Sequence, residues 1–488
     1  MIPEGPAATM PVFLALGGIV LYAVIRLFPS AYRGRAGTLS AIWLALAFLQ
    51  MLVAVLQTPL PPQTSYLGLT TGLLITGIGA IAAFASQGLL DPESPVHLYH
   101  PLILFALAGA VAVGFATDLF TIFVAVELSA VPVYALVAYR HREDPVATPA
   151  AMRYLLQGVA GTITALLGIA LLYFAGQTLE LAALPDALAG TDRGMLLTAA
   201  ILLVFGYGVK LAVVPLHAWL PDAYAHAPAG VTAILVGATK IGVLVALFLS
   251  LSALPFGSGV FSYLGMLVIF LAILTMTAGN LLALNQRDIR YILAYSSVAQ
   301  MGYILLGFGM GMVYDLELGF TAGLYYAIAY GVMKAGSFLV ADLFGRASGS
   351  FDVGQMRGVG TRHPGLGIAF AIFVLGLSGV PFTCGFLGKL LLEQAGMVTS
   401  MMSGVVLALI LALNSFVSLG YYVPVLSTLL FRGPPKDSAA DCISPSFPAG
   451  ATGCVVLLAV VTVYLGLFPE SFDWITHAAE QLFPWGMV

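Results

Sequence analysis

The sequence contains few charged residues: Lys, Arg, Asp and Glu together make up 8% of its 488 positions, and the net charge is −4. Soluble globular proteins carry about 25% charged residues, so this chain could not cover a water-facing surface. A nucleic-acid-binding protein would need a basic patch, and the sequence has no basic run. A disordered chain is excluded as well, because disorder requires low hydrophobicity and 60% of these residues are hydrophobic.

Cysteine is nearly absent. Cys384, Cys442 and Cys454 are too few and too scattered for an iron–sulfur cluster or a disulfide framework. The seven histidines do not show the spacing of metal ligands, and no Gly-rich phosphate loop is present. We therefore expect no metal ion, no cofactor and no redox centre in this chain. Any redox chemistry connected with it would occur in another polypeptide.

Long apolar runs dominate the sequence. A membrane-spanning helix needs about 20 apolar residues. About fourteen segments qualify: 7–28, 38–57, 66–90, 99–116, 119–139, 154–175, 195–214, 229–251, 259–284, 291–311, 317–343, 366–392, 399–431 and 449–468. The connections leave no room for a soluble domain. The expected fold is therefore an all-α polytopic membrane protein with about 14 transmembrane helices.

The basic residues of the connections have a one-sided distribution. Only Arg193 lies in a connection on one side of the expected topology. The other side carries thirteen, in the connections after the first, fifth, ninth, eleventh and thirteenth segments: Arg26, Arg33, Arg35, Arg140, Arg142, Arg153, Arg287, Arg290, Arg346, Arg357, Arg362, Arg432 and Lys436. Lys and Arg concentrate in cytoplasmic loops. We therefore expect a multi-pass protein of the cell (inner) membrane with both termini on the external side.

Four further basic residues lie inside apolar segments, and all are lysines: Lys210, Lys240, Lys334 and Lys389. Arginine stays charged, whereas a desolvated lysine can lose its proton. A charge in the middle of a bilayer costs at least about 2.5–3.5 kcal/mol on insertion scales. The segregation of lysine from arginine therefore indicates groups that bind and release protons.

Lys389 leaves more than one interpretation open, because it lies close to the end of its segment. Its long side chain could reach the lipid headgroups, or Glu393 at i+4 could neutralise it. Glu127 lies in the middle of a segment, with no charged residue nearer in sequence than Asp118. A carboxylate in that position needs a cationic partner or a proton. Asp118 itself is expected at the membrane interface.

Two segments are interrupted by proline beside a buried lysine. Val214-Pro215 follows Lys210, and Val380-Pro381 precedes Lys389. Proline removes a helical hydrogen bond, and matched breaks in two halves of a membrane protein indicate inverted repeats around a polar cavity. The predicted organisation is three N-terminal helices in 1–98, a first repeat in 99–253, a second repeat in 254–431 and a C-terminal helix in 432–488.

His217 and His226 lie in the connection that follows Lys210. Each could be a structural or interfacial residue, or could take part in proton uptake. The sequence alone does not separate these roles.

Two stretches carry a family resemblance: VKLAVVPLHAWLPDAYAHAPAGVTAILVGATK and NQRDIRYILAYSSVAQMGYILLGF. They resemble the antiporter-like, proton-conducting membrane subunits shared by respiratory complex I, membrane-bound hydrogenases and Mrp-type cation/proton antiporters. The resemblance covers most of the chain and implies 14 helices with two inverted five-helix repeats. It also implies that the partners are the lipid bilayer and other membrane subunits, including homologous antiporter-like ones, and not nucleic acid.

The resemblance extends to single residues. Glu127 is similar to the family's glutamate on the fifth helix, and Lys210 to the lysine of the broken seventh helix. Lys240 is similar to the lysine of the eighth helix, and Lys389 to the Lys or Glu of the broken twelfth.

The eleventh helix is the place where the sequence departs from many members. Lys334 is similar to a lysine that some members carry there, but Tyr330 stands where several carry histidine. Tyrosine does not carry a proton at neutral pH. Lys334 and trapped water would then have to connect the two halves.

The sequence thus predicts a non-catalytic pumping subunit of a larger complex that moves protons or exchanges protons for Na⁺. That complex would be an ion-translocating oxidoreductase or a multisubunit antiporter. In this interpretation Glu127 sets the proton affinity of Lys210, Lys240 and Lys334 pass charge through water, and Lys389 releases protons. Two alternatives stay open: a stand-alone secondary transporter of a small solute, which would need its own polar substrate cavity, and a structural membrane scaffold.

Overall fold

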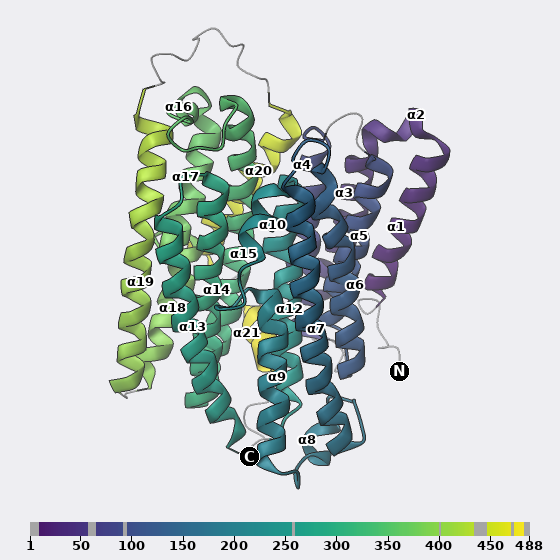
Figure 1. The fold of residues 1–488 in the computed structure, drawn as a ribbon, viewed down its shortest axis with the longest axis vertical. Coiled ribbons are helices and arrows are strands. Elements are labelled where there is room, and N and C mark those ends of the chain that lie inside the picture. Colours follow the sequence, from purple (N-terminus) through teal and green to yellow (C-terminus); the bar gives the residue numbers. More distant parts are fainter. Residues whose placement is uncertain are drawn as a thin grey trace.

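The computed structural model describes residues 9–56, 65–90, 95–255, 259–399, 402–433, 447–469 and 473–482. Within these ranges the chain is almost entirely helical, and the long helices run roughly parallel to one another (Figure 1). Helix α1 lies at one edge of the bundle and α19 at the opposite edge, with α12, α14 and α15 between them. The all-α membrane fold expected from the sequence is confirmed.

Among the described residues, thirteen helices are long and apolar enough to cross a membrane. They are α1 (Met10–Leu27), α3 with η1 (Arg33–Leu56), α4 (Tyr66–Ser86), α5 (Val96–Val113), α6 with η2 (Leu119–Arg140), α7 (Ala147–Gly176), α9 (Arg193–Leu211), α11 with η3 and α12 (Ala229–Ser252), α13 (Val260–Leu284), α14 (Ile289–Tyr314), α15 (Glu317–Ser348), α19 with η4 (Met402–Phe431) and α20 (Ala449–Leu467).

The expected twelfth segment consists of two shorter helices, α17 (Pro364–Ser378) and α18 (Cys384–Val398). Helix α17 ends at Gly379, whose φ of +91° is a left-handed conformation that suits glycine. The Val380 N–H then donates to the Leu375 carbonyl at 3.0 Å. The interruption predicted beside Pro381 is therefore confirmed.

The seventh segment ends in the same way. Helix α9 stops at Leu211, Ala212 adopts a φ of +58°, and the Val213 N–H donates to the Gly208 carbonyl at 2.9 Å. A short helix, α10 (Leu220–His226), follows the break. Both interrupted helices thus close with a left-handed residue and a hydrogen bond that spans five positions, which satisfies carbonyls that the missing turn would leave free.

Two long helices also begin in the same way. Asp118 is the N-cap of α6 and accepts a hydrogen bond from the Thr121 N–H at 2.8 Å. Asp288 caps α14 and accepts from the Arg290 N–H at 2.8 Å. Each aspartate also forms an isolated antiparallel bridge with a later connection. Asp118 therefore lies at a helix end, where the sequence places it.

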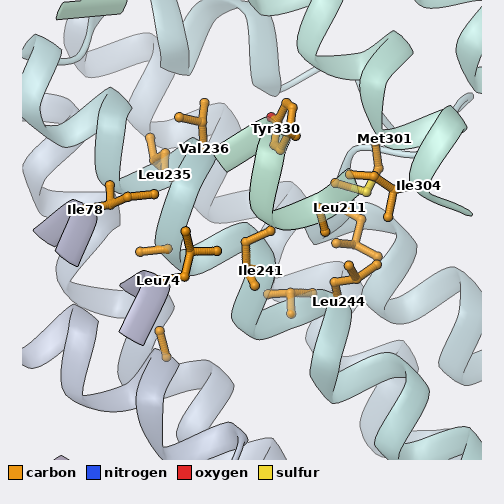
Figure 2. Packing of buried hydrophobic residues seen from close by; sticks show 14 of the residues in the cluster. Leu74, Ile78, Leu211, Leu235, Val236, Ile241, Leu244, Met301, Ile304 and Tyr330 are labelled. Atoms are coloured by element: carbon orange, nitrogen blue, oxygen red, sulfur yellow. The ribbon is translucent and has the colours of Figure 1, made fainter. Parts of the chain in front are cut away.

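Burial differs sharply between the centre and the edges of the bundle. The apolar windows of α11–α12 and of α15 are completely buried inside the protein, whereas only 28% of the α3 window is. Figure 2 shows Leu235, Val236, Ile241 and Tyr330 packed together in this centre. The two central elements that carry Lys240 and Lys334 are therefore shielded from lipid by the other helices.

One basic residue lies outside its expected connection. Arg153 is inside α7, which begins at Ala147 rather than near 154. Pro149 falls in the first turn, where proline does not interrupt a helix. The polar start of α7 thus extends the helix beyond its apolar part, and the Arg153 guanidinium pairs with Asp222.

Candidate functional site

Lys210 and Glu127 form an ion pair inside the bundle. The Lys210 Nζ lies 2.9 Å from the Glu127 Oε1, and Lys210 is 6% exposed. Thr162 Oγ1 donates to the same carboxylate oxygen at 2.6 Å, and Lys210 Nζ also donates to the Tyr134 hydroxyl at 3.2 Å. The cationic partner that the sequence requires for Glu127 is therefore Lys210.

The end of helix α9 explains why a lysine is held at this position. Lys210 lies in the last turn of α9, directly before the break. Carbonyls at a helix C-terminus carry a partial negative charge that stabilises a cation. The Trp219 Nε1 occupies one neighbouring carbonyl by donating to Val209 at 2.7 Å. The ammonium of Lys210 is thereby directed towards Glu127 and Tyr134.

Lys210 and Lys240 line one internal cavity. Its other lining residues are Val126, Ser129, Ala130, Tyr154, Trp219, Tyr224, Leu235, Thr239 and Val243. The space admits about one water molecule, given the volume that a water centre needs. Its polar lining comes from several elements, among them α6 (Ser129), α7 (Tyr154) and η3 (Thr239), and the space lies between the first two lysines.

Lys240 is buried without a hydrogen-bond partner among the described residues. It directly follows a π-helical turn, η3 (Leu235–Thr239), a distortion that is frequent at functional sites. The ring centres of Tyr224 and Tyr330 each lie 5.9 Å from its Nζ. Because an ammonium without a partner is costly to bury, Lys240 needs water from the cavity or must be neutral.

Lys334 is fully buried in α15. Its Nζ donates to the Leu293 carbonyl at 2.8 Å and to Ser296 Oγ at 2.5 Å, both on α14. Within the described ranges no carboxylate pairs with it. Neutral oxygens alone therefore solvate this lysine.

Lys389 does not reach the headgroups. It is 4% exposed, and its Nζ donates to the Leu377 carbonyl at 2.9 Å, across the break between α17 and α18. The same ammonium lies 4.6 Å from the ring centre of Tyr303. No ion pair within 4.0 Å joins it to Glu393 in the described part of the chain, and Glu393 is half-buried. The geometry of Lys389 thus disfavours both alternatives: a side chain that reaches the headgroups and direct neutralisation by Glu393.

Tyr330 lies at the contact between α15 and the segment of η3 and α12. It is fully buried on α15, one helical turn before Lys334. Beside it, Gly331 packs against Gly237 of η3 so closely that a Cβ added at Gly237 would lie 3.2 Å from the Gly331 carbonyl oxygen. This backbone approach brings the helix of Lys240 against the helix of Lys334.

The two histidines after Lys210 have different positions. His217 is half-buried in the break and is not among the cavity-lining residues. His226, at the end of α10, forms an ion-pair contact with Asp144, with 2.6 Å between Nδ1 and Oδ2. Neither histidine contacts one of the four buried lysines through a hydrogen bond within the described residues.

Comparison with known proteins identifies the family. Residues 116–415 match the family model described as NADH:quinone oxidoreductase/Mrp antiporter, TM, which is more than half of the chain. The chain belongs to this family. The matched stretch includes the five residues Glu127, Lys210, Lys240, Lys334 and Lys389.

Sequence relatives and solved structures agree with this assignment. The chain is 35% identical over 383 residues to an NADH-quinone oxidoreductase subunit N of Rhodococcus opacus (strain B4), which covers 76% of this chain and 67% of the relative. It is also 35% identical over 406 residues to a subunit N 1 of Sorangium cellulosum (strain So ce56), covering 80% and 78%.

Among solved structures, the chain is similar to a chain of an archaeal membrane-bound sulfane sulfur reductase, with a TM-score of 0.83, 25% identity and coverage of 98% and 97%. It is also similar to a chain of respiratory complex I from Thermus thermophilus, with a TM-score of 0.75, 27% identity and coverage of 94% and 97%.

Several polar residues around the lysines of this NADH:quinone oxidoreductase/Mrp antiporter family member were not predicted from the sequence. Tyr134 lies seven residues after Glu127 and therefore on the same face of α6, which was a usable signal. Gln300 donates to the Leu377 carbonyl at 3.3 Å, the group that also accepts from Lys389. Nothing in the sequence places α14 beside the α17 break, so this contact had no local signal.

The described residues contain no group of three or more His, Cys, Asp or Glu side chains that could hold a metal ion. Around the lysines, these residues bring together one carboxylate–ammonium pair at Lys210, the neutral oxygens that bind Lys334 and Lys389, and Lys240 without a hydrogen-bond partner. Chemically, such a set can bind, hold and pass protons.

Proposed function

We propose that this chain is the proton-moving, antiporter-like membrane subunit of a larger complex, and that Glu127, Lys210, Lys240, Lys334 and Lys389 form its proton pathway. The observation that carries the proposal is the ion pair, 2.9 Å long, between the half-buried Glu127 and the buried Lys210, which lines a cavity together with Lys240. A stand-alone transporter of a small solute is less well supported, because the cavity that Lys210 and Lys240 line admits about one water molecule.

The ion pair acts as the first proton switch. While the pair is closed, the Glu127 carboxylate stabilises the charged form of Lys210. When Glu127 moves away or is protonated, the partner that Lys210 keeps among the described residues is the Tyr134 hydroxyl. Its ammonium is then poorly solvated and releases a proton to the cavity.

Lys240 receives this proton through cavity water. Its Nζ faces the space between Tyr224 and Tyr330 and has no partner among the described residues. The close packing of Gly237 against Gly331 makes α15 the next element along the pathway. Lys334, with only neutral partners, then carries the charge into the second half.

Lys389 is the proposed release site. Its ammonium lies at the α17–α18 break, where the Leu377 carbonyl is freed from helical hydrogen bonding and accepts from it. Breaks of this kind line polar passages in membrane transporters. Glu393, half-buried one turn further on, stands where a proton could leave towards the external face.

The paired structural features support two inverted repeats, in 99–253 and 254–431, between the N-terminal region 1–98 and the C-terminal region 432–488. The matching ends of α9 and α17 and the matching starts of α6 and α14 are what such repeats would produce. The one-sided distribution of loop arginines supports an orientation in the inner membrane with both termini outside.

The partners in this proposal are other membrane subunits. The relatives from Rhodococcus opacus and Sorangium cellulosum carry the names of quinone oxidoreductase subunits. The chain leaves large apolar side chains of α19 exposed, including Leu409, Leu413 and Phe416. Lipid or neighbouring subunits would cover such a surface.

The test is substitution of Lys210 in the assembled complex, reconstituted into vesicles. Lys210→Ala should abolish proton translocation while assembly persists, because it deletes the proton site and removes a costly buried charge. Lys210→Arg should fail as well, since arginine keeps its proton. The exposed Arg357→Lys serves as control. Normal translocation by Lys210→Arg would exclude Lys210 as a proton carrier.

A further inference from the structure

Beyond the buried lysines, a second polar network surrounds His226 at the end of α10. The His226 Nδ1 lies 2.6 Å from Asp144 Oδ2, in the connection between α6 and α7. Its Nε2 lies 3.2 Å from the Tyr291 hydroxyl on α14. Tyr291 in turn donates to Asp222 Oδ1 at 2.9 Å, one turn back on α10. Both ring nitrogens of a 9% exposed histidine are thus engaged.

The hydrogen-bond donors and acceptors around the His226 ring match its doubly protonated form. Tyr291 has one hydroxyl proton, and that proton goes to Asp222, so the Tyr291 oxygen can only accept from His226 Nε2–H. On the other side, Nδ1 faces a carboxylate, which accepts but does not donate when ionised. All hydrogen bonds of the network can form at once when both nitrogens carry a proton, so the geometry matches a doubly protonated ring.

Asp144 fits the role of the ionised partner. Burial alone would raise the pKa of its carboxyl, but the hydrogen bonds from His226 and from the Val146 N–H, with the charges of His226 and Arg290, lower that pKa below its usual range. The Asp144 side chain is 24% exposed. It therefore connects His226 to the aqueous side of the membrane.

The other charged groups around α10 are already paired. Arg290 donates to the Ala225 carbonyl at 2.9 Å and pairs with Asp288 at 2.8 Å. Arg153, from α7, pairs with Asp222. His226 is consequently the one cation in contact with Asp144 within the described part of the chain, and its charge is balanced locally.

Helix α10 connects this network to the cavity of the lysines. Tyr224, two residues before His226, lines the cavity, and its ring centre is 5.9 Å from the Lys240 Nζ. Asp222 lies two residues earlier still. The proposed orientation places the Asp144 end of the network on the cytoplasmic side, so it lies between the cytoplasm and the first two lysines.

We propose that His226, Tyr291 and Asp222 form the proton relay that loads the lysine pathway from the cytoplasmic side. In one step His226 Nε2–H gives its proton to the Tyr291 oxygen while Tyr291 gives its own proton to Asp222. One N–H and one O–H bond break, and two O–H bonds form. His226 becomes neutral, Tyr291 stays neutral, and Asp222 becomes a carboxylic acid that gives its proton to water of the lysine cavity and returns to the carboxylate. A proton from the aqueous side, taken up beside Asp144, then restores the imidazolium.

This relay rests on the proposed function, and two separate measurements test it in the assembled complex. The first is ¹⁵N NMR of the complex with labelled histidine in this subunit, with His226→Gln used to assign the signals of His226. At pH 7 both ring nitrogens of His226 should be protonated. A neutral ring at pH 7 would overturn the relay, whatever the role of Lys210 proves to be.

The second measurement is proton translocation in vesicles by Tyr291→Phe, which removes one hydroxyl and leaves His226 protonatable. We expect a rate about tenfold lower than wild type, since a proton-transfer step loses its relay group. We expect wild-type translocation to slow as the cytoplasmic pH rises. His226→Gln should remove this pH dependence of the translocation rate. The matched control is His141→Gln. His141 is exposed and lies in the α6–α7 connection, which also carries Asp144.

An unchanged rate in Tyr291→Phe, or an unchanged pH profile in His226→Gln, would contradict the relay. Failure of the lysine pathway would appear differently, as normal translocation in Lys210→Ala with His226 still doubly protonated. The two proposals can therefore fail independently.

Discussion

At the scale of single residues, the four buried lysines are not equivalent. Within the described chain, Lys210 alone of the four has a carboxylate within 4.0 Å. Lys334 and Lys389 donate to carbonyls and hydroxyls, and Lys240 has no protein partner there. A buried charge without a counter-charge is unstable unless it is solvated or lost. In the proposed pathway, Lys210 is therefore the lysine with a counter-charge, and the other three depend on neutral groups or water.

Glu127→Gln should impair translocation, because it removes the carboxylate that stabilises charged Lys210. Combined with Lys210→Ala it should add little to the single defects, as expected for two members of one ion pair. Translocation rates of the two single variants and the double variant measure this coupling. Fully additive defects would show that the two residues act separately.

A substitution at Thr162 tests the same ion pair by removing one hydrogen bond to Glu127 while both charged residues stay in place. Thr162→Val removes the hydroxyl that donates to Glu127 at 2.6 Å and should cost that carboxylate about 1–3 kcal/mol of stabilisation, so the translocation rate should fall. Thr164→Val is the matched control, because the Thr164 hydroxyl binds only the Ala160 carbonyl of its own helix in the described structure. Equal rates for the two valine variants would contradict a role for Thr162.

At the scale of elements, the two broken helices are the features that create the site. Each break ends a helix with a left-handed residue, and at the second break the Leu377 carbonyl accepts a hydrogen bond from Lys389. Lys210 lies just before its break, whereas Lys389 lies just after its own. The two lysines are therefore held by different ends of their helices, although the turns between the helices are alike.

Gly379→Ala should disturb the second break. A φ of +91° is unfavourable for alanine, and its Cβ would lie 3.1 Å from Lys389 Cδ, so we expect a loss of about 1–2 kcal/mol and a displaced Lys389. Thermal unfolding of the complex and its translocation rate are the measurements. Gly365→Ala, in the first turn of α17 with no atom within 4 Å of the added Cβ, should be neutral.

The Lys389 series separates proton release from a packing role. Lys389→Met keeps the length of the side chain but deletes the titratable group, and should stop translocation. Lys389→Glu should keep part of it, because a carboxylate can also pass protons. Vesicle translocation and assembly are measured side by side. Full activity of Lys389→Met would move the release site elsewhere.

At the scale of the whole molecule, the buried share of each helix falls from the centre of the bundle to its edges. The central helices α11–α12, α14 and α15 are 94% to 100% buried in their apolar windows, and the outer α1, α3 and α19 are 28% to 33% buried. That centre carries Lys240 and Lys334, whereas Lys210 and Lys389 lie on the neighbouring helices α9 and α18. The outer helices separate this centre from lipid.

The orientation of the bundle is open to direct measurement. In a background without the three native cysteines, Arg142→Cys should react with a membrane-impermeant thiol reagent only from the cytoplasmic side. Gly190→Cys, in the connection on the opposite side, should react only from outside. The positive-inside bias is the reason for both expectations. The reverse labelling pattern would invert the proposed topology and the direction of the His226 relay.

The fold was largely readable from the sequence because a bilayer imposes simple rules. Each crossing needs about 20 apolar residues with internally satisfied backbone, so apolar runs alone located the helices. The break at Pro381 was predicted because proline removes a helical hydrogen bond. The start of α7 was missed, since polar residues such as Arg153 continue a helix beyond the membrane as readily as they end one.

The sequence by itself determined the membrane class, the lysines and Glu127, because rarity makes an ionisable residue in an apolar segment conspicuous. Only the tertiary structure decided what each contacts. The Glu127–Lys210 pair joins residues 83 positions apart, and the His226 network joins three separate elements. Such contacts depend on how helices far apart in sequence pack side by side, and helix packing leaves no periodic pattern in any one segment.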